Sequence, residues 1–330
     1  MSASQLTIYS SSDASGPGLL AGQANDLIRV LRACLVDGYS GKSAAGWSEP
    51  VAASGNCAGF KVGAGGSDCV VHVNDNGPNV TATYKEAWIT GWEVLTGVGT
   101  VGTGSGQFPL PSQLLTTGHA VVRKSTTADG VGRVWRLAAD SHTFYMFILT
   151  GDTASVYFAF VFGDIYAFSD DDTKRCLLIG RYQENSSAGN SEGFGHANLL
   201  AGPGVGHYMP RSWGGSGSSI LVSKAGNASF HEYTAGSLAF GSGGIIGANM
   251  SDNSIWITPV LVHHDSQLRG RIRGLYQILH TQASFADGQT FEGGGDFAGK
   301  TFTVVKPFLT TMGGVYGTVA IETSATVETN

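Results

Sequence analysis

The chain has 330 residues, of which 13% are charged and 49 are glycine, and its formal net charge is −6. This length is enough for one large domain or two medium domains with substantial cores. The densest basic stretch, Arg269, Arg271 and Arg273, is too short for an electrostatic footprint, so we expect no nucleic-acid partner. Because glycine is unfavourable in helices and favourable in turns, the composition predicts many short strands joined by turns.

Nothing in the sequence indicates a membrane or a metal. The segment from Met1 to Ser15 has no basic stretch followed by an apolar one, and no long apolar run occurs elsewhere, so we expect no signal peptide and no membrane insertion. The four cysteines lack a zinc-like spacing, and we expect no metal and no cofactor. Free buried thiols are the favoured state, with a Cys57–Cys69 bridge left open as the alternative.

One segment, at about Gly22 to Val36, has the periodicity of an amphipathic helix. Leu27, Leu31 and Leu35 recur with Cys34 on one face, while the arginines between them point elsewhere. Gly38 follows at the position where a left-handed residue ends a helix. The sequence therefore predicts one packing helix near the N-terminus.

The rest of the chain has strand character. The strands expected from apolar runs bounded by turn residues are Cys69–Val73, Arg133–Leu137, Thr143–Leu149, Val156–Phe162, Ile165–Phe168, Cys176–Tyr182, Ile220–Ser223, Ile255–His263, Thr301–Val305 and Val315–Glu322. The second and third of these are expected to form a hairpin, and Val156–Phe162 is expected to be covered on both faces. This pattern predicts a mainly β protein built from two β-sandwich or barrel-like domains.

The aspartates at 170–172 indicate a solvated break, and a domain boundary is placed there. The predicted N-terminal domain is then 1–169, with the helix at about 22–36, and the C-terminal domain is 170–330. In the second domain, Gln183–Ser219 is expected to form long exposed loops. Trp213, Tyr208 and His207 in these loops are the candidate surface or ligand contacts.

Several motifs resemble catalytic signatures, but chance and context explain them. The GxGxxG match at Gly97–Gly102 is followed by residues that cannot begin the required helix, and the GxSxG match around Ser191 lies in a polar stretch. In a chain this rich in glycine, about one match to such a motif is expected by chance. The Lys42 segment lacks the first glycine of a phosphate-binding loop.

Histidines offer two further candidates. His263 and His264 are adjacent on an expected strand and would point to opposite faces, which does not suit a shared metal. Asp140, Ser141 and His142 include the three residue types of a hydrolase triad, but their contiguity is typical of a turn. We therefore expect no catalytic residues.

Two series of residues carry a resemblance to a known group of proteins. The first comprises Ala33–Tyr39, Ala44–Trp47 with Pro50, Val73–Asp75, Trp92–Glu93, Gly106–Pro109, Lys124–Ala128, Trp135–Asp140 and Thr143–Tyr145. The second comprises Pro259–His263, Leu268–Tyr276, Gly299–Phe302 and Ile321–Ser324. Together they resemble a widespread group of uncharacterised virion structural proteins of tailed double-stranded DNA bacteriophages, associated with tail or other particle components. Arg273 departs from that pattern, which has proline at this position.

The resemblance implies a non-enzymatic particle protein of the tail, baseplate or fibre apparatus, present in the virion and assembled in the host cytoplasm. Its implied partners are further copies of itself and other virion proteins, and the low charge suits surfaces that dock onto neighbours. A capsid decoration protein is the alternative within this class. A module that binds host-surface carbohydrate through Trp213 is the alternative outside it, and a hydrolase using Ser191 is a third reading.

Overall fold

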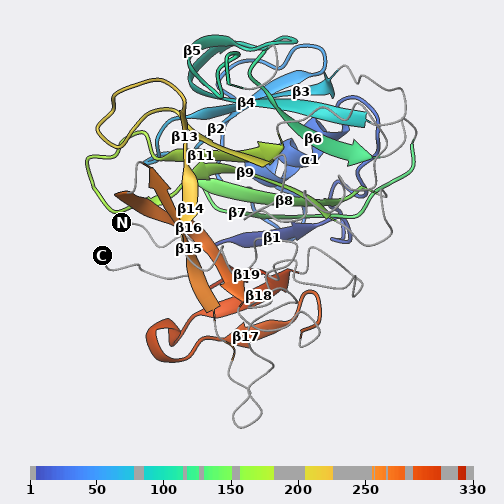
Figure 1. Cartoon of the computed structure of the whole chain (residues 1–330). Coiled ribbons are helices and arrows are strands. Elements are labelled where there is room, and N and C mark those ends of the chain that lie inside the picture. Colours follow the sequence, from blue (N-terminus) through green and yellow to red (C-terminus); the bar gives the residue numbers. More distant parts are fainter. Residues whose placement is uncertain are drawn as a thin grey trace, which may run out of the picture.

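The computed structural model describes residues 5–77, 85–113, 117–125, 130–150, 157–181, 205–225, 255, 257–264, 267–278, 285–305 and 319–324. Two antiparallel sheets make up most of this part of the chain, as Figure 1 shows. The mainly β class is confirmed, and so is the single α-helix near the N-terminus. Neither sheet closes into a barrel through the strands described.

The first sheet has twelve strands in the order β1-β7-β8-β9-β11-β6-β4-β3-β2, with β5 beside β4 and with β12 and β13 beside β11. Its strands are β1 (Thr7–Ser10), β2 (Cys57–Lys61), β3 (Val70–Gly77), β4 (Lys85–Gly97), β5 (Thr103–Phe108), β6 (Ala120–Ser125), β7 (Trp135–Ala139), β8 (Thr143–Leu149), β9 (Tyr157–Asp164), β11 (Cys176–Arg181), β12 (Val205–Met209) and β13 (Ile220–Leu221).

The second sheet has seven strands in the order β14-β15-β16-β19-β18-β17, and β10 pairs with β16. Its strands are β10 (Tyr166–Ala167), β14 (Ser223–Ala225), β15 (Ile257–His264), β16 (Gln267–Ile278), β17 (Thr290–Glu292), β18 (Thr301–Val305) and β19 (Val319–Glu322). A short 3-10 helix, Gly295–Phe297, lies between β17 and β18.

Helix α1 (Asp26–Arg32) continues into a π-helical turn at Ala33–Asp37. The predicted apolar face is confirmed, because Leu27, Leu31, Cys34 and Leu35 are all fully buried. The helix begins four residues later than predicted, since Asn25 before it has a φ of 69°. The predicted glycine stop is also confirmed: Gly38 has a φ of 73°, in the region that favours glycine.

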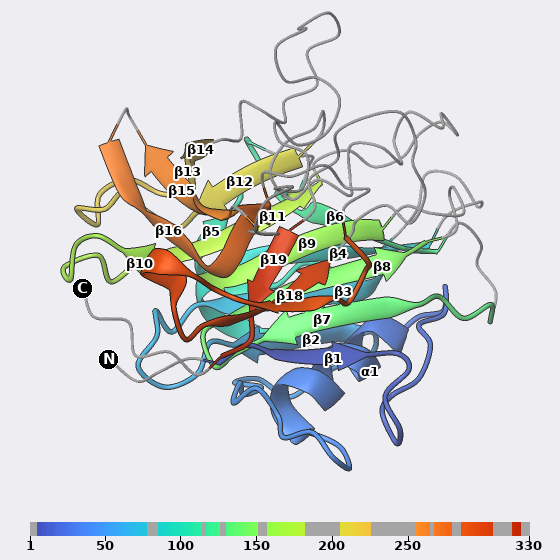
Figure 2. The same ribbon diagram turned by 90° about the horizontal axis from the view of Figure 1, so that it is seen from below.

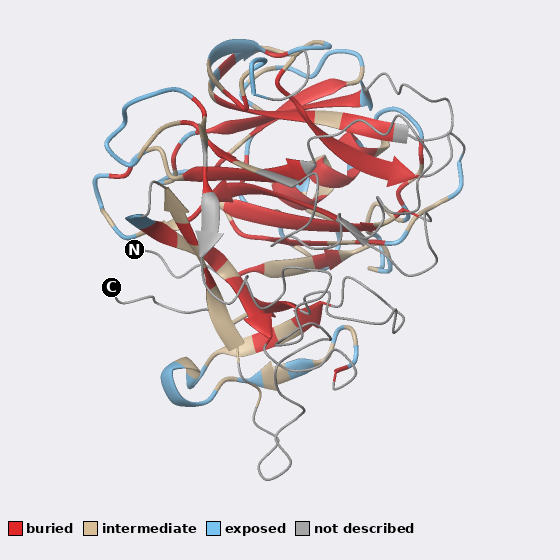
Figure 3. Ribbon diagram, in the orientation of Figure 1, coloured by how far each residue is buried: buried red, intermediate tan, exposed pale blue. Residues whose placement is uncertain are grey.

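The two faces of the central strands belong to two different cores. Helix α1, β2 to β4 and one face of β7, β8, β9 and β11 enclose the first core, which contains Phe144, Phe160 and Phe162. On the opposite face of the same strands, Tyr145 and Val161 pack against β15, β16 and β19 of the second sheet. The central strands are buried over their length in Figure 3, as expected for strands covered on both faces.

Several expected strands match the structure closely. The β7–β8 hairpin is confirmed by the pairing of Ala139 with Phe144, and β18 has the predicted bounds. β10 belongs to the second sheet, whereas β11, β12 and β13 after the aspartates at 170–172 belong to the first. Sheet membership therefore crosses residue 170 in both directions, and the division into domains 1–169 and 170–330 stays a prediction.

The pairing of β2 with β3 excludes a Cys57–Cys69 bridge. Cys57 lies opposite Asn74 and Lys61 lies opposite Val70, so the two cysteines are near opposite ends of this strand pair. Five residues of strand span about 16 Å, whereas a disulfide needs Cα atoms within roughly 7 Å. All four cysteines are buried and free, as favoured from the sequence.

Candidate functional site

The structure separates the three residues predicted as surface contacts. Trp213 is 52% exposed on the turn after β12, as a contact residue should be. Tyr208 is only 5% exposed and packs in the first core, so its prediction as a surface contact is wrong. The reason is that Val205–Met209 is strand β12, paired with β11 on one side and β13 on the other, and not an exposed loop. His207, whose side chain alternates with that of Tyr208, is partly buried.

Trp213 belongs to one end of the molecule where three segments lie side by side, as both Figure 1 and Figure 2 show. These segments are Phe168–Arg175, Pro210–Ser219 and the start of β16 at Gln267–Arg269. We call them together the aromatic end. The side chains of Phe168 and Leu268 are 57% and 53% exposed there. This end therefore presents three large apolar side chains, each more than half exposed, on adjacent segments.

Arg269 joins the three segments of the aromatic end. Its guanidinium donates to the Asp172 carboxylate over 2.6 and 2.9 Å, and it also donates to the backbone oxygens of Arg211 and Lys174. Both partners of the ion pair are almost completely buried. A charge-assisted, bidentate pair of this kind fixes geometry as well as charge. The three segments that carry the exposed apolar side chains are therefore held together by the buried contacts of Arg269.

A second charged group ties the aromatic end to the first sheet. Glu93 of β4 accepts from the Arg211 guanidinium and pairs with the Lys174 ammonium at 3.2 Å. These contacts are between positions more than 80 residues apart in sequence. The segments that carry Phe168 and Trp213 thus also carry charged groups, and protein interfaces commonly combine apolar and polar side chains in this way.

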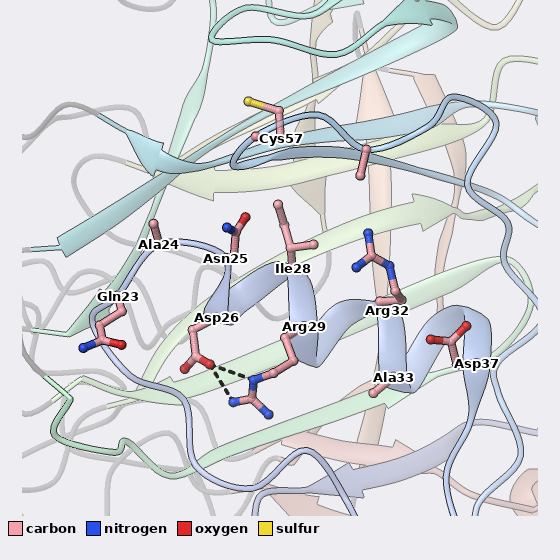
Figure 4. Close-up of a pocket in the computed structure, with 12 residues that line it drawn as sticks. Gln23, Ala24, Asn25, Asp26, Ile28, Arg29, Arg32, Ala33, Asp37 and Cys57 are labelled. Carbon is pink, nitrogen blue, oxygen red and sulfur yellow. Dashed lines mark hydrogen bonds and ion pairs between the residues drawn. The ribbon is translucent and has the colours of Figure 1, made fainter.

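A second candidate is the cavity of about 570 Å³ beside helix α1, shown in Figure 4. Its lining includes Asp26, Arg29 and Arg32 from the helix, with Gly55 and Cys57 opposite. The charged groups on the helix are engaged within the chain: Arg29 pairs with Asp26 at 2.6 Å, and Arg32 pairs with Glu49. The Arg32–Glu49 pair secures the helix to a neighbouring loop.

The candidate triad forms a turn, as predicted. The Asp140 carboxylate accepts from the backbone amides of His142 and Thr143 over 2.7 and 2.8 Å and from Arg273 over 2.9 Å. It therefore faces the arginine and not the imidazole. The His142 Nδ1 atom, which a triad would direct to the carboxylate, lies 2.9 Å from the Ser141 hydroxyl.

The described residues include only some of the remaining motifs. Gly97–Gly102 connects β4 to β5 as a hairpin, so a second strand follows it in place of the helix that a dinucleotide-binding loop requires. His263 and His264 end strand β15, while Asp265 and the GxSxG serine, Ser191, lie outside the described residues. In the part of the chain that the structure describes, no three potential metal ligands come together.

Sequence reasoning missed the base of the aromatic end. The sequence pattern predicts a solvated break at Asp172 and a short basic stretch at Arg269. The signal was present in the spacing, because Arg269, Arg271 and Arg273 alternate along one strand and can share a face. Such a row beside a core needs buried acids as partners, and Asp172 and Asp140 supply them.

No protein-family model matches the chain, and a search of curated proteins found no match. Among the described residues, no helix has the length and apolar character needed to cross a membrane.

Proposed function

We propose that the chain is a non-enzymatic structural component of a tailed bacteriophage particle, in its tail, baseplate or fibre apparatus, and that it acts by docking onto neighbouring subunits. The observation that carries this proposal is the aromatic end. Phe168, Trp213 and Leu268 are each more than half exposed there. Exposed aromatic groups on a braced surface are typical of contacts that bury them against a partner.

The sequence supports the proposal independently. The quoted segments resemble virion structural proteins of tailed phages, and only 13% of the residues are charged. Interfaces are depleted of charge at their centres and enriched in aromatic side chains. The proposed partners are other copies of this chain and other virion proteins, in particles assembled in the host cytoplasm.

The test is to fractionate purified particles and measure this protein in each fraction by quantitative mass spectrometry. The proposal expects a fixed number of copies in intact particles and in isolated tails. Recovery with tail-free heads alone would support a capsid decoration protein instead. Absence from every particle fraction would contradict both structural roles.

A variant pair links that result to the aromatic end. Replacing both Phe168 and Trp213 by alanine should remove the protein from particles, whereas Val131→Ala should not. Val131 is also half exposed, but it lies outside the aromatic end, before β7. Equal incorporation of the two variants would show that docking uses another surface.

One observation favours a second candidate, a module that binds host-surface carbohydrate. Trp213 presents an exposed ring two residues from Arg211, whose guanidinium is held by Glu93. An aromatic face beside fixed polar groups is a suitable platform for a sugar ring. A glycan array distinguishes the candidates: binding that Trp213→Ala abolishes would support the carbohydrate module, and an array without binding would count against it.

A further inference from the structure

Two of the four buried cysteines, Cys69 and Cys176, are neighbours in the first core. Cys176 is the first residue of β11, and Cys69 directly precedes β3. The Cys176 thiol interacts with the Cys69 thiol and with the Ser67 hydroxyl. Both cysteines are fully buried. The fold therefore brings together two thiols from distant parts of the sequence.

Hydrogen bonds around Asp164 place the two cysteines independently of this thiol contact. Cys176 of β11 pairs with Asp164 of β9. The Asp164 carboxylate accepts from the Ser67 amide over 2.8 Å and also from the Ser67 hydroxyl. The oxygen of that hydroxyl accepts from the Cys69 amide over 3.4 Å. Ser67 and Asp164 therefore join the two backbone segments that carry the thiols.

The other two cysteines have different surroundings. Cys34 lies in the π-helical turn that continues α1, and Cys57 begins β2 opposite Asn74. Burial raises the pKa of both thiols, and the carboxylates that add to the effect are Asp13 for Cys34 and Asp75 for Cys57. These two cysteines serve as internal comparisons for the pair.

The chain reaches the surface immediately before Cys69. Residues 63–68 form a turn between β2 and β3, in which Ala64, Gly65 and Asp68 are exposed. The Asp68 side chain, next to Cys69 in sequence, is 71% exposed. Local opening of a surface turn needs less free energy than global unfolding. Cys69 is therefore the thiol through which a dissolved reagent reaches the pair.

Backbone and arginine contacts hold the 63–68 turn closed. The Gly63 amide donates to the backbone oxygen of Ser141 over 2.7 Å. The Arg175 Nη2 atom donates to the backbone oxygen of Gly65 over 3.1 Å, and Nε of the same side chain lies 3.4 Å from Asp164. The Arg175 side chain is 30% exposed. A substitution there loosens the turn without emptying space in the first core.

From this arrangement we infer that Cys69 and Cys176 form a disulfide when the chain meets a small-molecule disulfide as oxidant, and that the 63–68 turn controls the rate. The Cys69 thiolate attacks one sulfur of the oxidant, and half of the oxidant leaves as a thiolate. The Cys176 sulfur then attacks the Cys69 sulfur of this mixed disulfide and displaces the other half. The two cysteines lose two protons and two electrons, and the oxidant is reduced to two thiols.

The order of the two attacks follows from the surroundings of Cys176. Burial raises the pKa of Cys176 well above its ordinary value, and the Cys69 thiol and the charge of Asp164 raise it further. Since the thiolate is the nucleophile, Cys176 reacts slowly with a dissolved oxidant. The contribution of the Cys69 thiol disappears once Cys69 is part of the mixed disulfide. The inference does not depend on the proposed role in the particle.

The test incubates the folded protein in glutathione buffers that range from fully reduced to fully oxidised. Free thiols are then alkylated in denaturant, and mass spectrometry of the digested protein locates each cysteine. In the oxidised buffers we expect a mass loss of two hydrogen atoms and a peptide pair joined through Cys69 and Cys176, both reversed by dithiothreitol. Cys34 and Cys57 should be alkylated throughout. Four alkylated cysteines in every buffer, a lasting glutathione adduct, or a different joined pair would overturn the inference.

Two arginine variants test the control by the turn. Arg175→Gln removes the side chain that holds Gly65 and should speed the joining of Cys69 to Cys176 at least tenfold. Arg29→Gln removes a surface ion pair on α1 and should leave the rate unchanged.

The rate at which Cys34 is alkylated in the folded, reduced protein distinguishes opening of the turn from global unfolding, because Cys34 is fully buried in the same core. This rate should be the same in Arg175→Gln as in the original protein. An unchanged rate of disulfide formation in Arg175→Gln, or an equal acceleration of Cys34 alkylation, would contradict control by the turn.

Discussion

Aromatic side chains are buried in the first core and exposed at the aromatic end. In the core, Phe144 packs edge-on against Trp47 and Phe160, with ring centroids 5.4 Å apart in each pair. Phe168, only a few residues after the end of β9, is 57% exposed, and so is about half of Trp213. Because more than half of each of these two side chains is exposed, each buries less apolar surface than an aromatic side chain of the core. Their exposure therefore concerns what the surface contacts and not how the core is stabilised.

Ion pairs also differ between the interior and the surface of the molecule. Lys124 and Asp75 form a pair at 2.6 Å that is almost fully buried, and Asp75 also accepts from the amides of Leu27 and Ile28 at the start of α1. Lys61 and Asp68 form a pair at 2.8 Å on the surface. The first pair attaches the helix to the sheet, whereas solvent screens the second.

The largest expected effect comes from breaking the buried pair. Asp75→Asn leaves the Lys124 ammonium buried without its counter-charge, and the free energy of unfolding should fall by about 3–5 kcal/mol. Asp68→Asn is the matched control at the surface and should cost at most about 1 kcal/mol. Urea unfolding of the two variants measures the difference, and similar losses would contradict the assigned roles.

Two phenylalanines give a direct comparison of core and surface. Phe160→Ala should lower the free energy of unfolding by about 3–5 kcal/mol, because it opens a cavity in the first core. Phe168→Ala removes the same atoms from an exposed position and should change that energy by no more than about 0.5 kcal/mol. A large loss for Phe168→Ala in urea would mean that the aromatic end is part of the folding core.

Two buried carboxylates should give opposite pH dependences. Burial raises the pKa of Asp140, but the charge and hydrogen bond of Arg273, with two amide bonds, outweigh it and the pKa is lowered. Burial of Asp164 raises its pKa despite the bonds from Ser67 and the charge of Arg175. The unfolded-state pKa of both is about 3.9. Asp140 therefore contributes stability above that pH, which is lost as the pH falls through its folded pKa.

Asp164 behaves in the reverse sense. Its contribution is present below about pH 3.9 and is lost as the pH rises through its raised folded pKa. Urea unfolding at closely spaced pH values measures both effects. Asp140→Asn should reduce the fall in the free energy of unfolding that occurs as the pH is lowered below about 4. Asp164→Asn should remove the fall in the free energy of unfolding that occurs as the pH rises above about 4. Parallel curves for the two variants would show that the carboxylates do not differ as described.

The smallest expected change in stability accompanies the proposed loss of docking. Replacing Phe168 and Trp213 together by alanine should leave the thermal midpoint within about 2 °C of the original. Self-association, measured by sedimentation velocity over a range of concentrations, should fall sharply in the same variant. Unchanged association would separate the aromatic end from the contacts between copies.

The sequence was most informative where the structure is local. The apolar spacing of Leu27 and Leu31 predicted the buried face of α1, and the Asp140–Ser141 turn predicted the β7–β8 hairpin. These elements depend on residues a few positions apart. The apolar run in β9 also predicted a strand covered on both faces, which the two cores confirm.

Elements that depend on distant partners were missed. β5 contains two glycines, its only residues with high strand propensity are Thr103 and Phe108 at its two ends, and it is held by pairing with β4. The sequence analysis did not predict β12, because its residues lie within a polar, glycine-rich stretch. The pairing of β12 with β11 is what buries Tyr208. At the aromatic end, Asp172 is buried only because Arg269 lies opposite, almost 100 positions later. A single sequence does not show such partners.

Cryo-electron microscopy of intact particles tests the central claim most directly, since it locates each copy and its contacts. We predict density for this chain in the tail, baseplate or fibre, with Phe168 and Trp213 of each copy buried against a neighbouring subunit. Particles that contain the chain with both side chains facing solvent in every copy, or particles that lack it, would contradict the proposal.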